Sequence, residues 1–382
     1  MVFTARIFSY CNMSERIDKD NFFMHDTKGN MTQLGAEMVQ SMHHNDLKRN
    51  TRIDWLDMAK GYGMLLVMFS HLGIGKYKVW IYTFHMPLFF FLSGFVFSTK
   101  YDFKTFFKRK CKAILVPYFA LGIPMVLFKI MEDTVQSGVL RREFAVTVFL
   151  KFLIQKRYLT LWYIACLFFL NLIFYIILKI CKKLSVTAIV VLLALLLGLE
   201  YYKIGGPALP WNIDVCLTGL SFFFCGYVLK IYYPKLKEKM SIKISVLCLC
   251  VCVLVNIAFG YWGRQISGAG MEMFKSKYGF PPFSFLSAFA GIFCVVLISH
   301  YFTNRLIKYI GRNSLLYYAW HQTIMIPVVR SVFQIVGIPF ENFPNDYAML
   351  CERVIELIFV VFALTICNII ISNSKLKFML GH

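Results

Sequence analysis

The segment IYTFHMPLFFFLSGFVF (residues 81–97) is long and apolar enough to cross a membrane, yet it carries a histidine, His85, near one end. A membrane-spanning helix needs about 20 mostly apolar residues, and lipid cannot hydrogen-bond the backbone, so such a segment must be helical. Fourteen residues before His85, the segment GMLLVMFSHLGI (63–74) holds His71 in the same setting. Ionisable groups inside a membrane span are costly, so two of them point to a functional site.

The composition of the whole chain agrees with a polytopic membrane protein. Of its 382 residues, 58% are hydrophobic and only 16% are charged, whereas about 25% charged residues are usual in soluble domains. The apolar runs predict an all-α transmembrane bundle of about ten helices. The predicted spans are residues 55–74, 79–98, 112–130, 159–180, 185–202, 210–231, 242–262, 283–303, 313–333 and 349–372. Segment 143–155 is too short to cross and predicts an interfacial helix.

Polar ends flank one membrane domain. Residues 1–50 lack the apolar core of a signal peptide and predict a mobile cytoplasmic tail. Residues 51–374 predict the membrane-embedded domain, and 375–382 a short cytoplasmic tail. No internal repeat and no soluble second domain is visible in the sequence. These features predict a multi-pass protein of the plasma or inner membrane.

The formal net charge of +21 comes mainly from Lys and Arg between the apolar runs. This distribution is typical of membrane orientation rather than nucleic-acid binding, and the excess in the even-numbered loops predicts that both termini are cytoplasmic. Most of the twelve cysteines lie inside apolar runs, as small buried hydrophobes do. No CxxC pair and no close HxxxH spacing is present, so we expect no metal.

The first predicted span carries a polar line along one face. Lys60 lies eleven residues before His71, which at 100° per residue places both on one stripe, ~16.5 Å apart along the axis. Asp57 falls close to the same stripe. His85, early in the returning second span, lies at a depth similar to that of His71. The two imidazoles are therefore expected to face each other or a common cavity.

Further polar groups lie near the same predicted level. Asn212 and Asp214 open one span, Trp162 opens another, and His321 falls near mid-membrane in the ninth. His321 and Trp162 have plainer interpretations, because buried histidines often only hydrogen-bond to neighbouring helices and Trp often only marks the membrane interface. Asp214 is harder to dismiss, because a carboxylate inside a span needs a partner such as a protonated His, Lys or Arg. In the last span, Glu352 and Glu356 are expected either to bind a substrate hydroxyl or to pair with nearby arginines.

Basic residues gather on the predicted cytoplasmic side, in FKRKCKAILVPYF (107–119). Lys108, Arg109 and Lys112 are expected either to anchor the span at the membrane surface or to bind phosphate groups.

Six stretches of the sequence form motifs: RIDWLDMAKGYGMLLVMFSH (52–71), FHMPLFFFLSGF (84–95), RKCK (109–112), LWYIACLF (161–168), PWNIDVCLTGLSFFFCGYVL (210–229) and GRNSLLYYAWHQ (311–322). Taken together, these motifs resemble the acyltransferase 3 family of integral membrane acyltransferases, and within it the fucose 4-O-acetylase-like branch. The resemblance covers about residues 52–372, with Lys112 in place of the second arginine of the family's R-x-x-R motif and Tyr163 where many members have Phe.

The resemblance implies an enzyme that moves an acyl group, usually acetyl, from cytoplasmic acyl-CoA to a sugar hydroxyl of a cell-surface or lipid-linked glycan. His71 is then the expected general base, since imidazole suits proton transfer near neutral pH. His85 is expected to orient it or bind substrate, and Lys60 to stabilise negative charge. Asp57, Trp162, Asn212, Asp214 and His321 are the expected substrate-binding residues. Lys108, Arg109 and Lys112 are the expected acetyl-CoA-binding residues.

Two other functions remain open from the sequence alone. A glycan transporter or flippase would use the histidines as a proton relay, although transporters often show repeated halves. If the protein were a membrane scaffold without activity, replacing His71 would leave the acylation of glycans unchanged.

Overall fold

The computed structural model describes residues 53–337 and 345–381, and the predicted tail 1–50 lies outside this part of the chain. Within the described part, all regular secondary structure is helical apart from one isolated backbone bridge between Glu272 and Lys277. This confirms the all-α prediction.

A helical segment occupies each of the ten predicted spans. These segments are α2 (Asp54–His71), α3 (Lys78–Phe95), α5 (Val116–Ser137), α7 (Trp162–Cys181), α8 (Leu184–Lys203), α9 (Ile213–Lys239), α10 (Ile242–Ser267), α11 (Pro281–Tyr301), the pair α13 (Ser314–Trp320) and α14 (Ile326–Ile335), and α15 (Asp346–Ser372). Shorter elements join them: α4 (Phe103–Lys110), α6 (Arg142–Ile154), α12 (Arg305–Arg312), η1 (Gly75–Tyr77), η3 (Pro210–Asn212), η4 (Met273–Lys275) and η6 (Lys375–Leu380).

Seven helices of the described chain are long and apolar enough to cross a membrane. Their ranges are Phe103–Ser137, Trp162–Cys181, Leu184–Lys203, Pro210–Lys239, Ile242–Ser267, Pro281–Tyr301 and Asp346–Ser372. The number ten and the orientation therefore stay predictions, whereas a polytopic helical membrane protein is confirmed. Large apolar side chains such as Leu247 and Leu254 of α10 are exposed, as expected for helices that face lipid.

Two predicted spans differ from regular helices. The third does not begin at residue 112, because a π-helical segment, η2 (Cys111–Leu115), joins α4 to α5 without a break. The ninth is interrupted by a second π-helical segment, η5 (His321–Met325). Such segments insert an extra residue into a helical turn and are frequent at functional sites.

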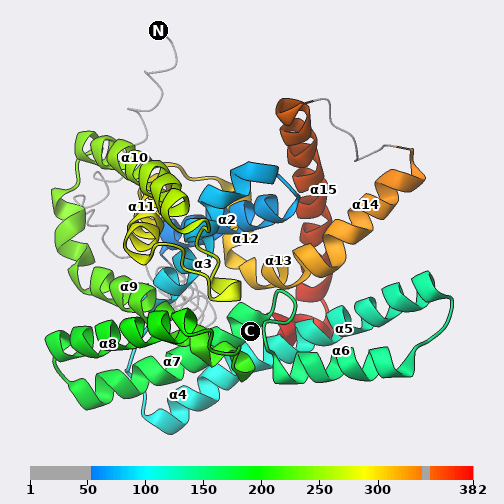
Figure 1. The fold of residues 1–382 in the computed structure, drawn as a ribbon, viewed down its shortest axis with the longest axis horizontal. Coiled ribbons are helices and arrows are strands. Elements are labelled where there is room, and N and C mark those ends of the chain that lie inside the picture. Colours follow the sequence, from blue (N-terminus) through cyan, green and yellow to red (C-terminus); the bar gives the residue numbers. More distant parts are fainter. Residues whose placement is uncertain (1–52, 338–344, 382) are drawn as a thin grey trace, which may run out of the picture. The chain divides into compact units, whose positions relative to one another are not determined.

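Glycines allow the central helices to come into backbone contact. A Cβ atom on Gly94 of α3 would lie 1.9 Å from the carbonyl oxygen of Phe223, and one on Gly226 of α9 would lie 1.9 Å from that of Phe91. Small residues serve this purpose in membrane helix packing. In Figure 1, α2 and α3 are central, α10 and α11 lie on one side, and α5 and α6 extend on the other.

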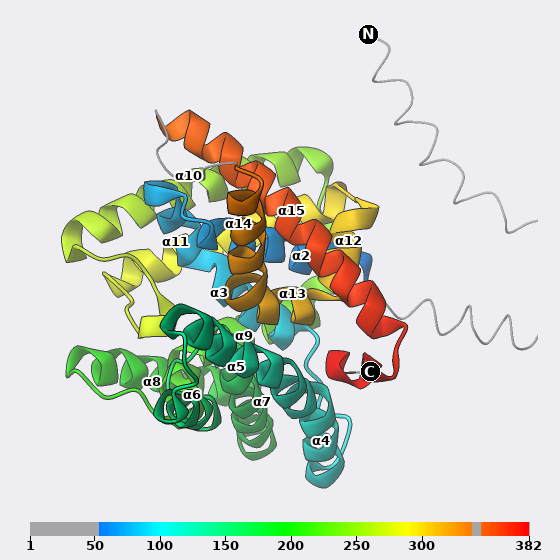
Figure 2. The same ribbon diagram turned by 90° about the vertical axis from the view of Figure 1, so that its right-hand side faces the viewer.

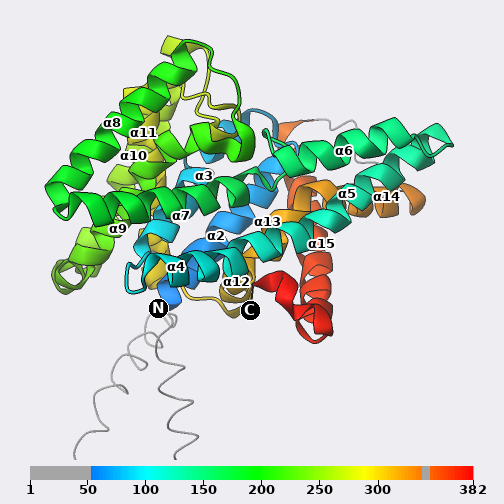
Figure 3. The same ribbon diagram turned by 90° about the horizontal axis from the view of Figure 1, so that it is seen from below.

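The same arrangement is visible from below, where the α5–α6 hairpin and α14 project away from α8, α10 and α11 (Figure 3). Tyr118 of α5 stacks on Phe152 of α6 at 5.1 Å between ring centroids and donates to its carbonyl oxygen. The C-terminal segment η6 packs against α5 and buries Met379. Figure 2 shows η6 following α15 near the beginning of α5.

Candidate active site

Three histidines, two from neighbouring helices and one from a distant part of the chain, meet at one end of the central helices. His71 is the last residue of α2, which stops there because Gly73 takes a left-handed φ of 86° that favours glycine. His85 lies in α3, and His321 is the first residue of η5. The ring centroid of His71 is 5.1 Å from that of His321 and 6.5 Å from that of His85.

The hydrogen bonds of His71 and His321 determine their tautomers. His321 Nδ1 lies 3.0 Å from the carbonyl oxygen of Tyr317 and 2.9 Å from that of Tyr318. A carbonyl oxygen only accepts, so Nδ1 carries the proton and Nε2 of the neutral ring has the lone pair. His71 Nδ1 lies 2.8 Å from the carbonyl oxygen of Val67 and 3.2 Å from His321 Nε2, and donates to both. His71 Nε2 is therefore left unprotonated.

His85 has the same tautomer by the same argument. Its Nδ1 donates to the carbonyl oxygen of Ile81 at 2.9 Å, which leaves Nε2 with the lone pair. The ring of Tyr82 lies beside both imidazoles, 4.9 Å from His85 and 6.0 Å from His71 between centroids. The cluster thus presents basic ring nitrogens next to a tyrosine.

The three imidazoles line a cavity of about 370 Å³. Its wall combines aromatic rings with groups that hydrogen-bond, a composition typical of small-molecule sites. The aromatic lining residues are Tyr82, Trp162, Phe274 and Tyr318, and the polar ones are Lys129, Thr160, Glu272, Lys275, Gln322 and Thr323. Trp162 and Phe274 meet edge to face, with ring centroids 5.8 Å apart.

Asn212 and Asp214 stand behind this wall rather than in the cavity lining. Asp214 accepts from the Arg157 guanidinium and, at 3.0 Å, from the hydroxyl of Ser276. Asn212 accepts from the backbone N–H of Arg157 at 2.9 Å and donates to the carbonyl oxygen of Trp162 at 3.2 Å. Asp214 therefore holds, through Ser276, the loop that contributes Glu272, Met273, Phe274 and Lys275 to the cavity, whereas Asn212 holds the backbone at Arg157 and Trp162.

Asp57 and Lys60, the other two residues of the polar line predicted along α2, do not line the cavity. Asp57, near the start of the helix, is buried and accepts from Arg312 Nε at 2.9 Å. Lys60 is half-buried and lies three helical turns before His71. Of the polar line predicted along α2, only the His71 end reaches the cavity.

The basic segment lies at the opposite end of the central helices. Lys108, Arg109 and Lys112 are exposed, and the Arg109 guanidinium lies 4.5 Å from the ring centroid of Tyr101.

The position of this segment follows from Lys110, which lies within it and whose Nζ is 5.8 Å from the ring centroid of Phe97. Phe97 follows α3, twelve residues after His85, so the two sites are roughly 18 Å apart along that helix. A ligand bound by the basic residues has to extend along this distance to reach the histidines.

Sequence reasoning missed several residues of the cavity wall. Lys129 lies within the third predicted span, so its charge was a usable signal, and Gln322 adjoins His321. Glu272, Phe274 and Lys275 lie in a connecting loop, and nothing in their spacing indicates that the loop covers a cavity. Their position depends on the contacts of Asp214 and Ser276 described above.

Comparison with known proteins agrees with this geometry. The model of the acyltransferase 3 family, described as an acyltransferase domain, matches residues 53–372. The chain therefore belongs to this family and is a membrane acyltransferase. No individual curated protein and no solved structure gave a match.

Proposed function

We propose that this enzyme transfers an acyl group, acetyl in the simplest case, from cytoplasmic acyl-CoA to a sugar hydroxyl of a cell-surface or lipid-linked glycan. The observation that carries the proposal is the cavity lined by His71, His85 and His321, in which the hydrogen bonds leave His71 Nε2 unprotonated. The enzyme resides in the plasma or inner membrane, where donor and acceptor reach it from opposite sides.

His71 is the general base of the proposed reaction. Its Nε2 takes the proton of the acceptor hydroxyl as that oxygen attacks the thioester carbonyl. The carbon–sulfur bond breaks, the CoA thiolate leaves, and the proton held by His71 neutralises it. His321 Nε2, which accepts from His71 Nδ1, stabilises the imidazolium form while the proton is held. His85, whose ring centroid lies 6.5 Å from that of His71, binds the acceptor or the developing negative charge.

The aromatic and polar wall suits a sugar acceptor. Faces of Trp162 and Phe274 provide apolar surface for a sugar ring, while Gln322, Thr323 and Glu272 offer partners for its hydroxyl groups. A cavity of about 370 Å³ has room for one or two sugar units.

The donor, acyl-CoA, binds at the end of the central helices opposite the histidine cluster. We place the CoA phosphates on the exposed Lys108, Arg109 and Lys112, because guanidinium and ammonium groups both suit phosphate. Lys60, between the basic segment and the histidines along α2, stabilises negative charge on the donor. The thioester arm then extends through the central helices to His71.

The test compares wild type with His71→Ala in the native host that lacks its own copy. Alkali-labile acyl groups on the surface glycans are measured by mass spectrometry, at equal amounts of protein in the membrane. We expect the mutant glycan to lose one acyl group per repeat unit. Unchanged acylation would contradict the role of His71, and complete absence of the glycan from the surface would favour a transporter.

A further inference from the structure

A buried group of charges lies next to the histidines but is not part of the cavity lining. Glu356 of α15 is fully buried and accepts from Arg330 Nε at 2.7 Å and from Arg353 Nη1 at 2.7 Å. A carboxylate in this position needs such partners, since an uncompensated charge at membrane depth is costly. The sequence had left open whether Glu356 binds substrate or pairs with arginine, and the structure pairs it with both arginines.

Arg330 also reaches the end of the helix that carries His71. Its Nη2 donates to the carbonyl oxygen of Leu72 at 3.0 Å. Leu72 directly follows His71 and caps α2, and carbonyl oxygens at a helix end lack partners within the helix. A cation there is also favoured by the helix dipole.

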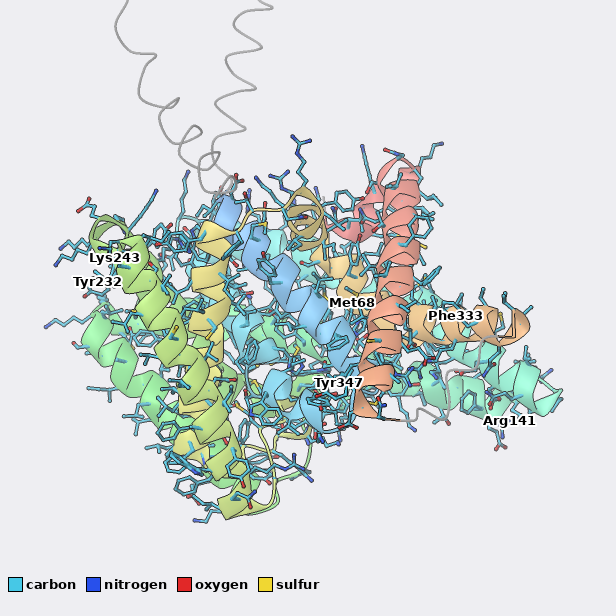
Figure 4. The ribbon with its side chains drawn as sticks, turned by 90° about the horizontal axis from the view of Figure 1, so that it is seen from above. Met68, Arg141, Tyr232, Lys243, Phe333 and Tyr347 are labelled. Atoms are coloured by element: carbon cyan, nitrogen blue, oxygen red, sulfur yellow. The ribbon has the colours of Figure 1, made fainter. Side chains whose placement is uncertain are left out.

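One guanidinium therefore joins three elements around the catalytic histidine. Arg330 belongs to α14, which continues directly from η5, and His321 is nine residues earlier on the same segment. Glu356 fixes Arg330 to α15, and the Leu72 carbonyl fixes it to α2. In Figure 4, Phe333 marks α14 and Tyr347 marks the start of α15, which approaches the end of α2. Phe333 packs against Phe359 of α15 at 4.9 Å between centroids.

We propose that Arg330, held by Glu356, is a positioning residue that sets the contact between His71 and His321 for acyl transfer. The proposal rests on the function proposed above. Arg330 touches neither imidazole, so it acts through the backbone of Leu72 and through the η5–α14 segment. Its planar guanidinium donates to Glu356 and to the Leu72 carbonyl oxygen at the same time. The ammonium group of a lysine at this position cannot reproduce that geometry.

The test uses the full-length enzyme in lipid nanodiscs with acetyl-CoA and, as acceptor, surface polysaccharide purified from the native host that lacks its own copy of the enzyme, and compares wild type with Arg330→Lys. Lysine keeps the charge beside Glu356 but loses the bond to the Leu72 carbonyl. We expect kcat to fall at least tenfold while KM for acetyl-CoA changes less than twofold, because small misplacement of a catalytic group has a large effect on rate. We also expect diethyl pyrocarbonate to modify His71 at least threefold faster, as measured by peptide mass spectrometry.

The matched control is Asp346→Asn. Asp346 pairs with Lys76 at 2.8 Å and also ties α15 to the chain that follows α2, but this pair is exposed. We expect its kcat to stay within twofold of wild type. If Arg330→Lys does not fold, Glu356→Gln replaces it, since Gln keeps the size and an acceptor for Arg330 while removing the charge, and it should show the same loss of kcat.

Three results would overturn the proposal: full kcat in Arg330→Lys, a loss of activity that only follows the loss of folded protein, or misfolding of both variants. His71→Ala is measured in parallel. An inactive His71→Ala beside a fully active Arg330→Lys would refute the positioning role alone. A fully active His71→Ala would instead refute the proposed mechanism.

Discussion

At the residue scale, the chemistry depends on which nitrogen of each imidazole carries the proton. In His71, His85 and His321, Nδ1 donates to a backbone carbonyl oxygen of the preceding turn. This shared local bond determines the tautomer of each neutral ring, in which Nδ1 carries the proton and Nε2 has the basic lone pair. His300 of α11 makes the same bond, to Val296, but stacks on Trp55 away from the cavity. The local bond alone therefore does not identify a catalytic histidine, and the role proposed for His71 depends also on the shared cavity.

His321 is predicted to support His71 through its acceptor nitrogen. In His321→Leu, the Nδ1–H of His71 loses this partner, and the imidazolium formed during the reaction is less stable. We expect kcat to fall at least tenfold, roughly the effect of one lost charge-assisted hydrogen bond of about 1.5–3 kcal/mol. His321→Gln, whose side-chain oxygen can accept in place of Nε2, should retain more activity than His321→Leu. Equal activities of the two variants in a steady-state acyl-transfer assay would contradict this role.

The sequence could predict only part of this cluster. His71 and His85 are close in sequence on a tight helical hairpin, so helix geometry alone suggested a common depth. His321 was recognised as an intramembrane histidine, but its contact with His71 joins residues 250 positions apart. That contact depends on the packing of α13 and η5 against α2, which no local pattern encodes.

At the scale of the element, the loop over the cavity is held from behind by a buried ion pair. Removing the charge in Asp214→Asn leaves the Arg157 guanidinium poorly paired. We expect a loss of stability near the lower end of the roughly 3–5 kcal/mol found for broken buried pairs, because Arg157 is partly exposed. The loop 268–280 should exchange its amide hydrogens faster, and KM for the acceptor should rise severalfold. Unchanged hydrogen exchange in this loop would contradict the account.

The contact of α3 with α9 predicts that its glycines are intolerant of larger residues. In Gly226→Leu the side chain would begin 1.9 Å from the carbonyl oxygen of Phe91, so the two helices must separate. We expect a large loss of folded protein, measured as the monodisperse fraction after detergent extraction. Gly270→Ala is the control, because the nearest atom to its Cβ, from Val79, lies at an ordinary 3.7 Å. A normal yield of Gly226→Leu would show that the helices are packed differently.

Helix positions were largely predictable because long apolar runs leave the backbone no alternative in lipid. The start of the third span was not predicted correctly, because the basic residues before Cys111 suggested a loop. They instead form α4, whose first turn is capped by the Asp102 carboxylate accepting from the N–H of Thr105 at 3.2 Å. Hydrogen bonds from Thr105, first from its side chain and second from this N–H, hold the pKa of Asp102 below its usual value. The π-helical segment that joins α4 to α5 has no sequence signal that we could use.

At the scale of the whole described bundle, the proposed orientation places the histidine cluster in the outer half of the membrane. Figure 4 shows Lys243 at the upper left, by the start of α10, and Arg141 at the lower right, by the connection between α5 and α6. We expect Arg141→Cys to react with an impermeant maleimide in intact cells, and Lys243→Cys only after permeabilisation. The background carries Ser at the exposed Cys250 and Cys351. The reverse labelling pattern would show that the protein has the opposite orientation in the membrane. The donor would then bind on the other side from the one assigned here.

The central claim is that the lone pair of His71 Nε2 drives acyl transfer, and His71→Asn tests it most directly. Asparagine keeps an N–H donor near the position of Nδ1 for Val67 and His321, but has no counterpart of Nε2. In the purified enzyme in lipid, with acetyl-CoA and glycan acceptor, we expect release of CoA thiol to fall a hundredfold or more. The control His300→Asn should remain active. A folded His71→Asn enzyme with wild-type turnover would contradict the account.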